Sequence, residues 1–137
     1  MLYDKLIIDT NLLLLLIIGS IDDGMHIDKS GSLNNYDMGD YDNILKIIKN
    51  TKEIYITPYI ATEVSNLIDL KGNLKEKAFE ICREIFNNFK QVKIDIHSDI
   101  NENSFIYFGL ADASLVKLAP NYNILTADNR LLVELYK

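Results

Sequence analysis

Four acidic residues of this chain occupy positions that a purely structural role explains poorly. They are Asp9 at the end of a first apolar run, Glu63 in a helical pattern after a strand, Asp112 within an apolar helical segment, and Asp128 after the last strand-like run. Asp112 is the most informative, because the residues four before it and three and four after it are apolar and turn it inward. Burying an ionised carboxylate without a partner costs several kcal/mol, and few basic residues lie near it in the sequence. A metal ion is the natural partner.

The identity of that ion follows from the types of side chain. Because no histidine accompanies the four acids, Mg²⁺ or Mn²⁺ bound through oxygen is favoured over zinc. Each acid taken singly also has a structural explanation: Asp9 or Asp128 could cap a helix, Glu63 could lie on an exposed helix face, and Asp112 could be a lone structural buried acid. Their ordered occurrence at equivalent structural points favours a shared metal site.

The elements that must position these acids alternate between strands and helices. Strand-like runs span 6–9, 53–57, 92–96 and 123–126, and helical patterns span 12–18, 41–52, 58–70, 73–89, 104–119 and the segment from 128 onward. This alternation predicts the α/β class, as a three-layer α/β/α fold with a central, mainly parallel sheet of four or five strands. The run 12–18 is apolar on every side, and we expect a buried helix capped by Thr10 or Asn11.

Parallel strands end at the same edge of a sheet, where their following residues meet in one crevice. Asp9 and Asp128 directly follow predicted strands, and Glu63 lies about one and a half turns into the helix that leaves the second strand. Only the helix of Asp112 must lay its middle over this crevice. The predicted fold therefore brings the four acids together.

Length, charge and cysteine content narrow the class of protein. The 137 residues predict a single domain over 1–137, with a long exposed loop or insertion at about 19–40 in which His26 is exposed. The net charge of −6, from 20 acidic and 14 basic residues, argues against coating of nucleic acid by bulk positive charge. Cys82 is the single cysteine, which excludes an internal disulfide. The apolar run is far shorter than the ~20 residues that span a bilayer, so we expect a cytoplasmic protein with no membrane partner.

The ordered motifs of this chain resemble the PIN-domain family of metal-dependent ribonucleases, which includes the VapC-type toxins. The resemblance spans nearly the whole sequence, through IIDTN, TPYIATEVSNLI, GLADASLVKLA and ILTADNRLL. The first and last motifs are fairly specific together, whereas the middle two are degenerate. Position by position, the acidic quartet of the family matches Asp9, Glu63, Asp112 and Asp128, and its supporting polar positions match Asn11 and Thr126.

This resemblance implies a PIN-like domain that acts as an endoribonuclease, hydrolysing phosphodiester bonds of RNA with Mg²⁺ or Mn²⁺ as cofactor. Asp9, Asp112 and Asp128 would ligate the metal directly, and Glu63 would do so directly or through a water molecule. Arg130 is the best candidate for a phosphate contact near the site. The family also suggests the toxin of a toxin–antitoxin pair, with an antitoxin protein as partner, and a homodimer.

Two features depart from the family pattern. The segment 19–40 is long for this class of domain, and the sequence ends soon after its last helical pattern, so that the final edge strand of the family is expected to be short or missing. Tyr36, Tyr41 and Tyr107 could stack on bases, although packing within the protein is the ordinary role of such rings.

Two alternatives to a nuclease are open, a scaffold protein and a different phosphate-handling α/β enzyme that uses Asp9 as a nucleophile. The first is a PIN-like scaffold that has lost catalysis and binds RNA or protein, against which the presence of all four acids argues. A haloacid-dehalogenase-like phosphatase would need a second acid two positions after Asp9, where Asn11 stands. A receiver domain would need a phosphoacceptor after a central strand and a late lysine near the site, which the spacing does not supply.

Overall fold

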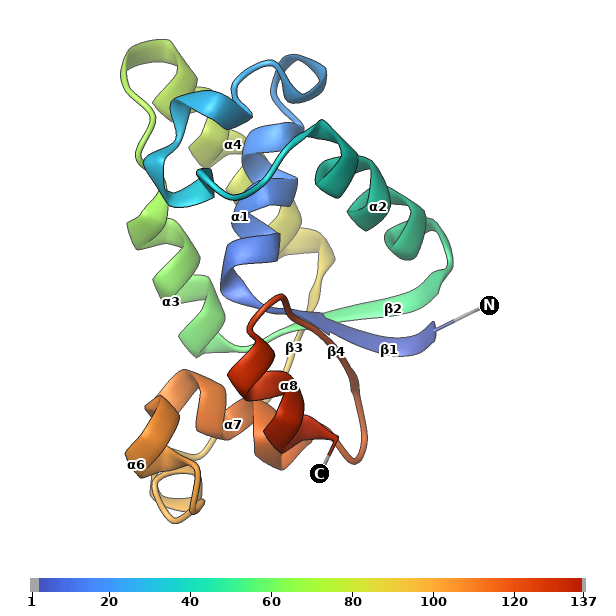
Figure 1. Ribbon diagram of the computed structural model, residues 1–137, viewed down its shortest axis with the longest axis vertical. Coiled ribbons are helices and arrows are strands. Elements are labelled where there is room, and N and C mark those ends of the chain that lie inside the picture. Colours follow the sequence, from blue (N-terminus) through green and yellow to red (C-terminus); the bar gives the residue numbers. More distant parts are fainter. Residues whose placement is uncertain (1–2, 137) are drawn as a thin grey trace.

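An all-parallel sheet of four strands forms the centre of the computed structural model, which describes residues 3–136 (Figure 1). The strands are β1 (Tyr3–Ile8), β2 (Thr51–Ile56), β3 (Lys90–Gln91) and β4 (Asn123–Leu125), in the spatial order β3-β2-β1-β4. Leu6 of β1 is paired with Ile54 of β2 on one side and with Asn123 of β4 on the other. All four strands therefore end at the same edge of the sheet, as the sequence predicts.

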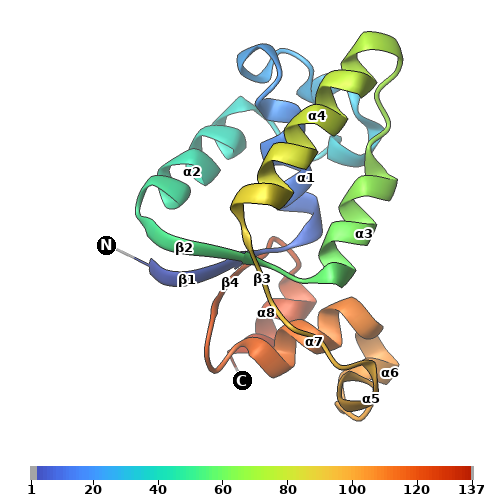
Figure 2. The ribbon, with the colours of Figure 1, turned by 180° about the vertical axis from the view of Figure 1, so that it is seen from behind.

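Helices cover both faces of this sheet, which confirms the predicted three-layer α/β/α fold. One face carries α1 (Thr10–Gly19), α2 (Met38–Lys49), α3 (Pro58–Leu67) and α4 (Gly72–Asn88); the other carries α5 (Ile96–Asp99), α6 (Phe105–Phe108), α7 (Leu110–Leu118) and α8 (Asn129–Leu135) (Figures 1 and 2). Within residues 3–136, no helix is long and apolar enough to cross a membrane.

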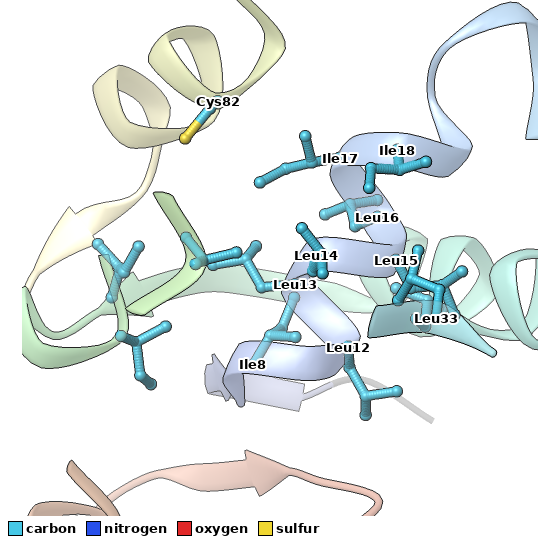
Figure 3. Close-up of a cluster of buried hydrophobic side chains, with 14 of the residues drawn as sticks. Ile8, Leu12, Leu13, Leu14, Leu15, Leu16, Ile17, Ile18, Leu33 and Cys82 are labelled. Atoms are coloured by element: carbon cyan, nitrogen blue, oxygen red, sulfur yellow. The ribbon is translucent and has the colours of Figure 1, made fainter. Parts of the chain in front are cut away.

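The apolar run after β1 is the buried helix α1, as expected, but its cap is Asp9 rather than Thr10 or Asn11. The Asp9 side chain accepts a hydrogen bond from the backbone N–H of Thr10. Every residue of α1 except Asn11 is buried, because α2, α3 and α4 all pack around it. Cys82 of α4 belongs to the same core (Figure 3).

The segment between α1 and α2 is more ordered than the predicted exposed loop. It folds into the short 3₁₀ turns η1 (Asp22–Gly24), η2 (Ile27–Lys29) and η3 (Gly31–Leu33). Ile21, Ile27 and Leu33 are buried in the core, and Leu33 lies beside Leu15 of α1 (Figure 3). The prediction of an exposed His26 is wrong, since this side chain is buried and its Nε2 lies 2.8 Å from the Asp22 carboxylate.

Two predicted elements in the second half of the chain have different boundaries. The strand expected at 92–96 is not formed: β3 ends at Gln91, because its partner strand β2 ends at Ile56, and the backbone then leads to α5, which Asp95 caps with its side chain. His97, expected on a loop, lies in this short helix. The helix expected at 104–119 is broken by Gly109, whose φ of 84° lies in the left-handed region that suits glycine.

The burial of α1 predicts a large cost for shortening one of its side chains. We expect Ile17→Ala to lower the free energy of unfolding by about 3 kcal/mol, because Ile17 is fully buried and its loss leaves a cavity. The matched control is Ile106→Ala on α6, where the side chain is 84% exposed and the change should stay within about 0.5 kcal/mol. Chemical denaturation measures both, and equal effects would contradict the assigned core.

Candidate functional site

All four predicted acids line one cleft of about 330 Å³. Asp9 joins β1 to α1, Glu63 lies on α3, Asp112 on α7, and Asp128 caps α8. Asn11 and Thr126, the predicted supporting residues, also line the cleft, and no described Lys, Arg or His does. The cleft is therefore bordered by four carboxylates and by uncharged side chains.

The carboxylate of Asp9 is oriented by one hydrogen bond to each oxygen. Its Oδ1 accepts from the backbone N–H of Thr10 at 2.7 Å, and its Oδ2 accepts from the Thr126 hydroxyl at 2.7 Å. The backbone N–H of Asp9 donates to the carbonyl of Leu125 at 2.8 Å, which ties the end of β1 to the end of β4. Helix capping thus fixes the direction of Asp9 and leaves lone pairs on both of its oxygens for another ligand.

Thr126 links Asp9 to Asp128. Its buried hydroxyl donates to Asp9 and accepts from the backbone N–H of Asp128 at 3.1 Å. Asp128 in turn caps α8 through Oδ1, which accepts from the N–H groups of Arg130 and Leu131. For both aspartates the structural role that the sequence suggested, a helix cap, coexists with a position on the cleft.

Glu63 is held by a residue that the sequence analysis did not assign to the site. The Thr10 hydroxyl donates to Oε2 of Glu63 at 3.1 Å, joining the first turn of α1 to α3. The sequence places the Thr10 hydroxyl next to Asp9 at the edge of the sheet, but no local pattern indicates its partner on α3. Asn11 lines the cleft but is exposed and makes no hydrogen bond to any described residue, so its supporting role stays a prediction.

Asp112 is the acid without a partner. It is half-buried on α7, and its carboxyl group accepts no hydrogen bond from the described residues. Burial first, and then the negative charges of Asp9, Asp128 and Glu63, together raise the pKa of Asp112 to about 7, and Arg130 opposes this shift. The fold therefore gathers like charges around this side chain without neutralising them.

The predicted aromatic and basic substrate-binding residues differ in whether they line the cleft. The guanidinium of Arg130 is exposed and lies 5.2 Å from the ring centroid of Phe108, outside the lining of the cleft. Among the three tyrosines considered for stacking, Tyr36 lines the cleft, Tyr41 is buried and Tyr107 is 75% exposed on α6. The phosphate contact of Arg130 stays a prediction.

The donor set of the cleft fits a hard divalent cation, because carboxylate oxygens are the preferred ligands of Mg²⁺ and Mn²⁺. Within residues 3–136, no three His, Cys, Asp or Glu side chains are grouped tightly enough to hold an ion as they stand. A cation in the cleft would offset the repulsion between these carboxylates.

The chain was compared with known proteins by family and by sequence. No protein-family model matches it, and no curated protein matches it as a relative.

The burial of Asp112 and the like charges around it predict that Asp112→Asn increases the free energy of unfolding in EDTA, by an amount that depends on pH. The pKa of Asp112 is raised from 3.8 to about 7, so the folded protein holds an extra proton between these values and loses stability as the pH rises through them. We expect the variant to be more stable than the original at about pH 8, by about 1–2 kcal/mol because solvent partly screens this half-exposed group. The gain should vanish towards pH 4.

The control for this measurement is Asp42→Asn, which removes an exposed carboxylate on α2. Its effect on the free energy of unfolding should stay within about 0.5 kcal/mol across the same pH range. Denaturation curves recorded at several pH values compare the variants, and parallel profiles for the two substitutions would contradict the repulsion.

Proposed function

We propose that this chain is a PIN-like, Mg²⁺- or Mn²⁺-dependent endoribonuclease. The observation that supports the proposal most strongly is the unpaired carboxylate of Asp112, which lines a cleft together with Asp9, Glu63 and Asp128. An arrangement that costs stability in this way is explained if a cation enters the cleft and compensates the charges.

The side chains of the cleft have different roles in this proposal. Asp9, Asp112 and Asp128 would hold the metal, and Glu63 would join them directly or through water. A bound Mg²⁺ or Mn²⁺ lowers the pKa of a coordinated water and stabilises the charge that develops on the phosphate. Thr126 keeps the Asp9 carboxylate in its direction, and Thr10 does the same for Glu63.

The negative charges of the protein and of its cleft are compatible with a phosphodiester substrate only when metal is bound. The protein has a net charge of −6, and the described residues that line the cleft include no basic side chain. A polyanion is repelled from such a cleft until divalent cations offset its carboxylates. Arg130 at the rim of the acidic site is the basic group best placed to meet a phosphate beyond the cleft. The choice of RNA rather than DNA rests on the PIN-domain resemblance.

The rival proposal is a PIN-like scaffold that binds RNA or protein without cleaving it. It receives support from the loose grouping of the acids, since no three of them form a ready ion site within residues 3–136. A toxin–antitoxin role, a homodimer and a cytoplasmic location stay predictions from the resemblance and the sequence.

Cleavage of RNA separates these proposals. We expect the purified protein to cleave a mixed pool of structured RNAs with Mg²⁺ or Mn²⁺, and to lose this activity in EDTA. Asp112→Asn should lower the rate by about 100-fold or more, because it removes a charge that holds the metal while keeping the shape of the side chain. Asp42→Asn should cleave normally.

Thermal melting with and without metal completes the test, because an ion that binds only the folded protein raises its melting temperature. No cleavage together with no thermal shift would overturn the nuclease proposal and favour the scaffold. A thermal shift without cleavage of the pool would support the metal site and contradict a general ribonuclease.

A further inference from the structure

Two of the three side-chain hydroxyl groups that line the cleft donate hydrogen bonds to the acids. The Thr10 hydroxyl donates to Glu63, and the Thr126 hydroxyl donates to Asp9. Two side chains that line the cleft have donors without a partner among residues 3–136, the exposed amide of Asn11 and the phenol of Tyr36. Tyr36 is the more informative, because it comes from the segment that departs from the PIN-domain pattern.

The position of Tyr36 is fixed from both sides along the chain. On the amino-terminal side, its backbone N–H donates to the carbonyl of Leu33 at 3.0 Å, and Leu33 is buried in the core. On the carboxyl-terminal side, Asp37 and Asp40 form a capping box that starts α2. These two anchors fix the backbone of Tyr36 between η3 and α2.

The segment before Tyr36 is also tied to the rest of the protein. Asp69, in the connection between α3 and α4, accepts from the Ser30 hydroxyl at 2.6 Å and from the backbone N–H of Ser32 at 3.2 Å. These bonds, together with burial of Ile27, attach the 3₁₀ turns to the helical layer that also carries Glu63. The segment is therefore fixed to the protein next to the cleft, and Tyr36 is the residue that it contributes to the lining.

The ring and the hydroxyl of Tyr36 have separate surroundings. The half-buried ring packs against the hydrophobic core, whereas the hydroxyl has no hydrogen-bond partner among the described residues. Burial raises the pKa of this phenol, and the charges of Asp9 and Asp40 raise it further, so the hydroxyl keeps its proton and lies within electrostatic reach of the acids.

We propose that the Tyr36 hydroxyl donates a hydrogen bond to a phosphodiester oxygen of the nucleic acid strand bound at the cleft, an inference that rests on the proposed function. An uncharged donor suits this position, because a lysine or arginine would pair with the carboxylates and compete with the metal. The segment between α1 and α2 thus contributes a substrate-binding residue that the four acidic motifs do not contain.

Tyr36→Phe tests the hydroxyl, because phenylalanine keeps the ring that packs against the core. Tyr36→Ala removes both parts, and Tyr122→Phe is the matched control. Tyr122 is also half-buried and its hydroxyl also lacks a partner among residues 3–136, but it lies at the amino end of β4, away from the cleft. Each protein is melted with and without Mn²⁺ to show that folding and metal binding are retained.

Binding is measured by fluorescence anisotropy with a short labelled single-stranded RNA and Ca²⁺ in place of Mg²⁺, and cleavage is measured under single-turnover conditions with Mg²⁺. Tyr36→Phe should weaken RNA binding, and raise the half-saturating protein concentration for cleavage, by about tenfold, the usual effect of losing a hydrogen bond to a charged group. Its metal-induced thermal shift should equal that of the unmodified protein, and Tyr122→Phe should behave normally in every assay.

Normal RNA binding by Tyr36→Phe would overturn the inference, and a loss confined to Tyr36→Ala would assign the effect to the ring instead. An equal loss in Tyr122→Phe would also contradict a specific role of Tyr36. If the unmodified protein neither binds nor cleaves RNA, the proposed function itself fails and the inference fails with it.

Discussion

The turn between β1 and α1 constrains most of this structure. Asp9 must cap α1, because the helix is apolar on every side and its first N–H groups would otherwise lie unpaired next to the core. The same turn pairs the backbone of Asp9 with Leu125 at the end of β4. α1, around which α2, α3 and α4 pack, therefore begins at the edge of the sheet where the strands end. Its cap, Asp9, consequently places a carboxylate on the cleft.

Capping and ligation make compatible demands on an aspartate. A cap needs a carboxylate oxygen that faces backbone N–H groups, and ligation of a cation needs lone pairs that face a cavity. At Asp128 one oxygen accepts both N–H groups of α8, and at Asp9 each oxygen accepts only one bond. Helix capping thus orients two of the acids before any ligand binds, so that little side-chain entropy would be lost on binding. A site arranged in this way is preorganised. Asp112 differs from these two acids because no hydrogen bond to a described residue orients it.

The sequence predicts those parts of the site that follow from sheet topology. Asp9 and Asp128 could be assigned to one edge because each follows a strand of a parallel sheet, and the apolar face around Asp112 indicated its inward direction. Thr10 was missed because its hydrogen bond to Glu63 joins two helices whose relative position no local pattern records. Similarly, Tyr36 could be named as an aromatic candidate, but its place on the cleft depends on contacts of the preceding turns with the core.

The errors in the fold have local physical causes. Alternating residues at 92–96 suggested a strand, but β2 offers no partner beyond Ile56, and Asp95 caps the helical turn that starts at Ile96. Gly109 adopts a left-handed conformation that breaks one predicted helix into α6 and α7. In the segment between α1 and α2, the polar composition concealed Ile21, Ile27 and Leu33, whose burial converts an apparent loop into part of the core.

Electrostatics connects the stability of this protein to the function proposed for it. A lone buried acid is usually compensated by a basic side chain, but a salt bridge at Asp112 would fill the cleft and occupy the lone pairs that a cation needs. Leaving the charge uncompensated lowers stability, and under the proposed function this cost would fall when a divalent ion binds, because the ion would offset several carboxylates together. The same ion would weaken the negative field that a phosphodiester meets. One binding event would then tighten the site, stabilise the fold and admit the substrate, which is a coherent reason for four acids to share a cleft without a basic partner.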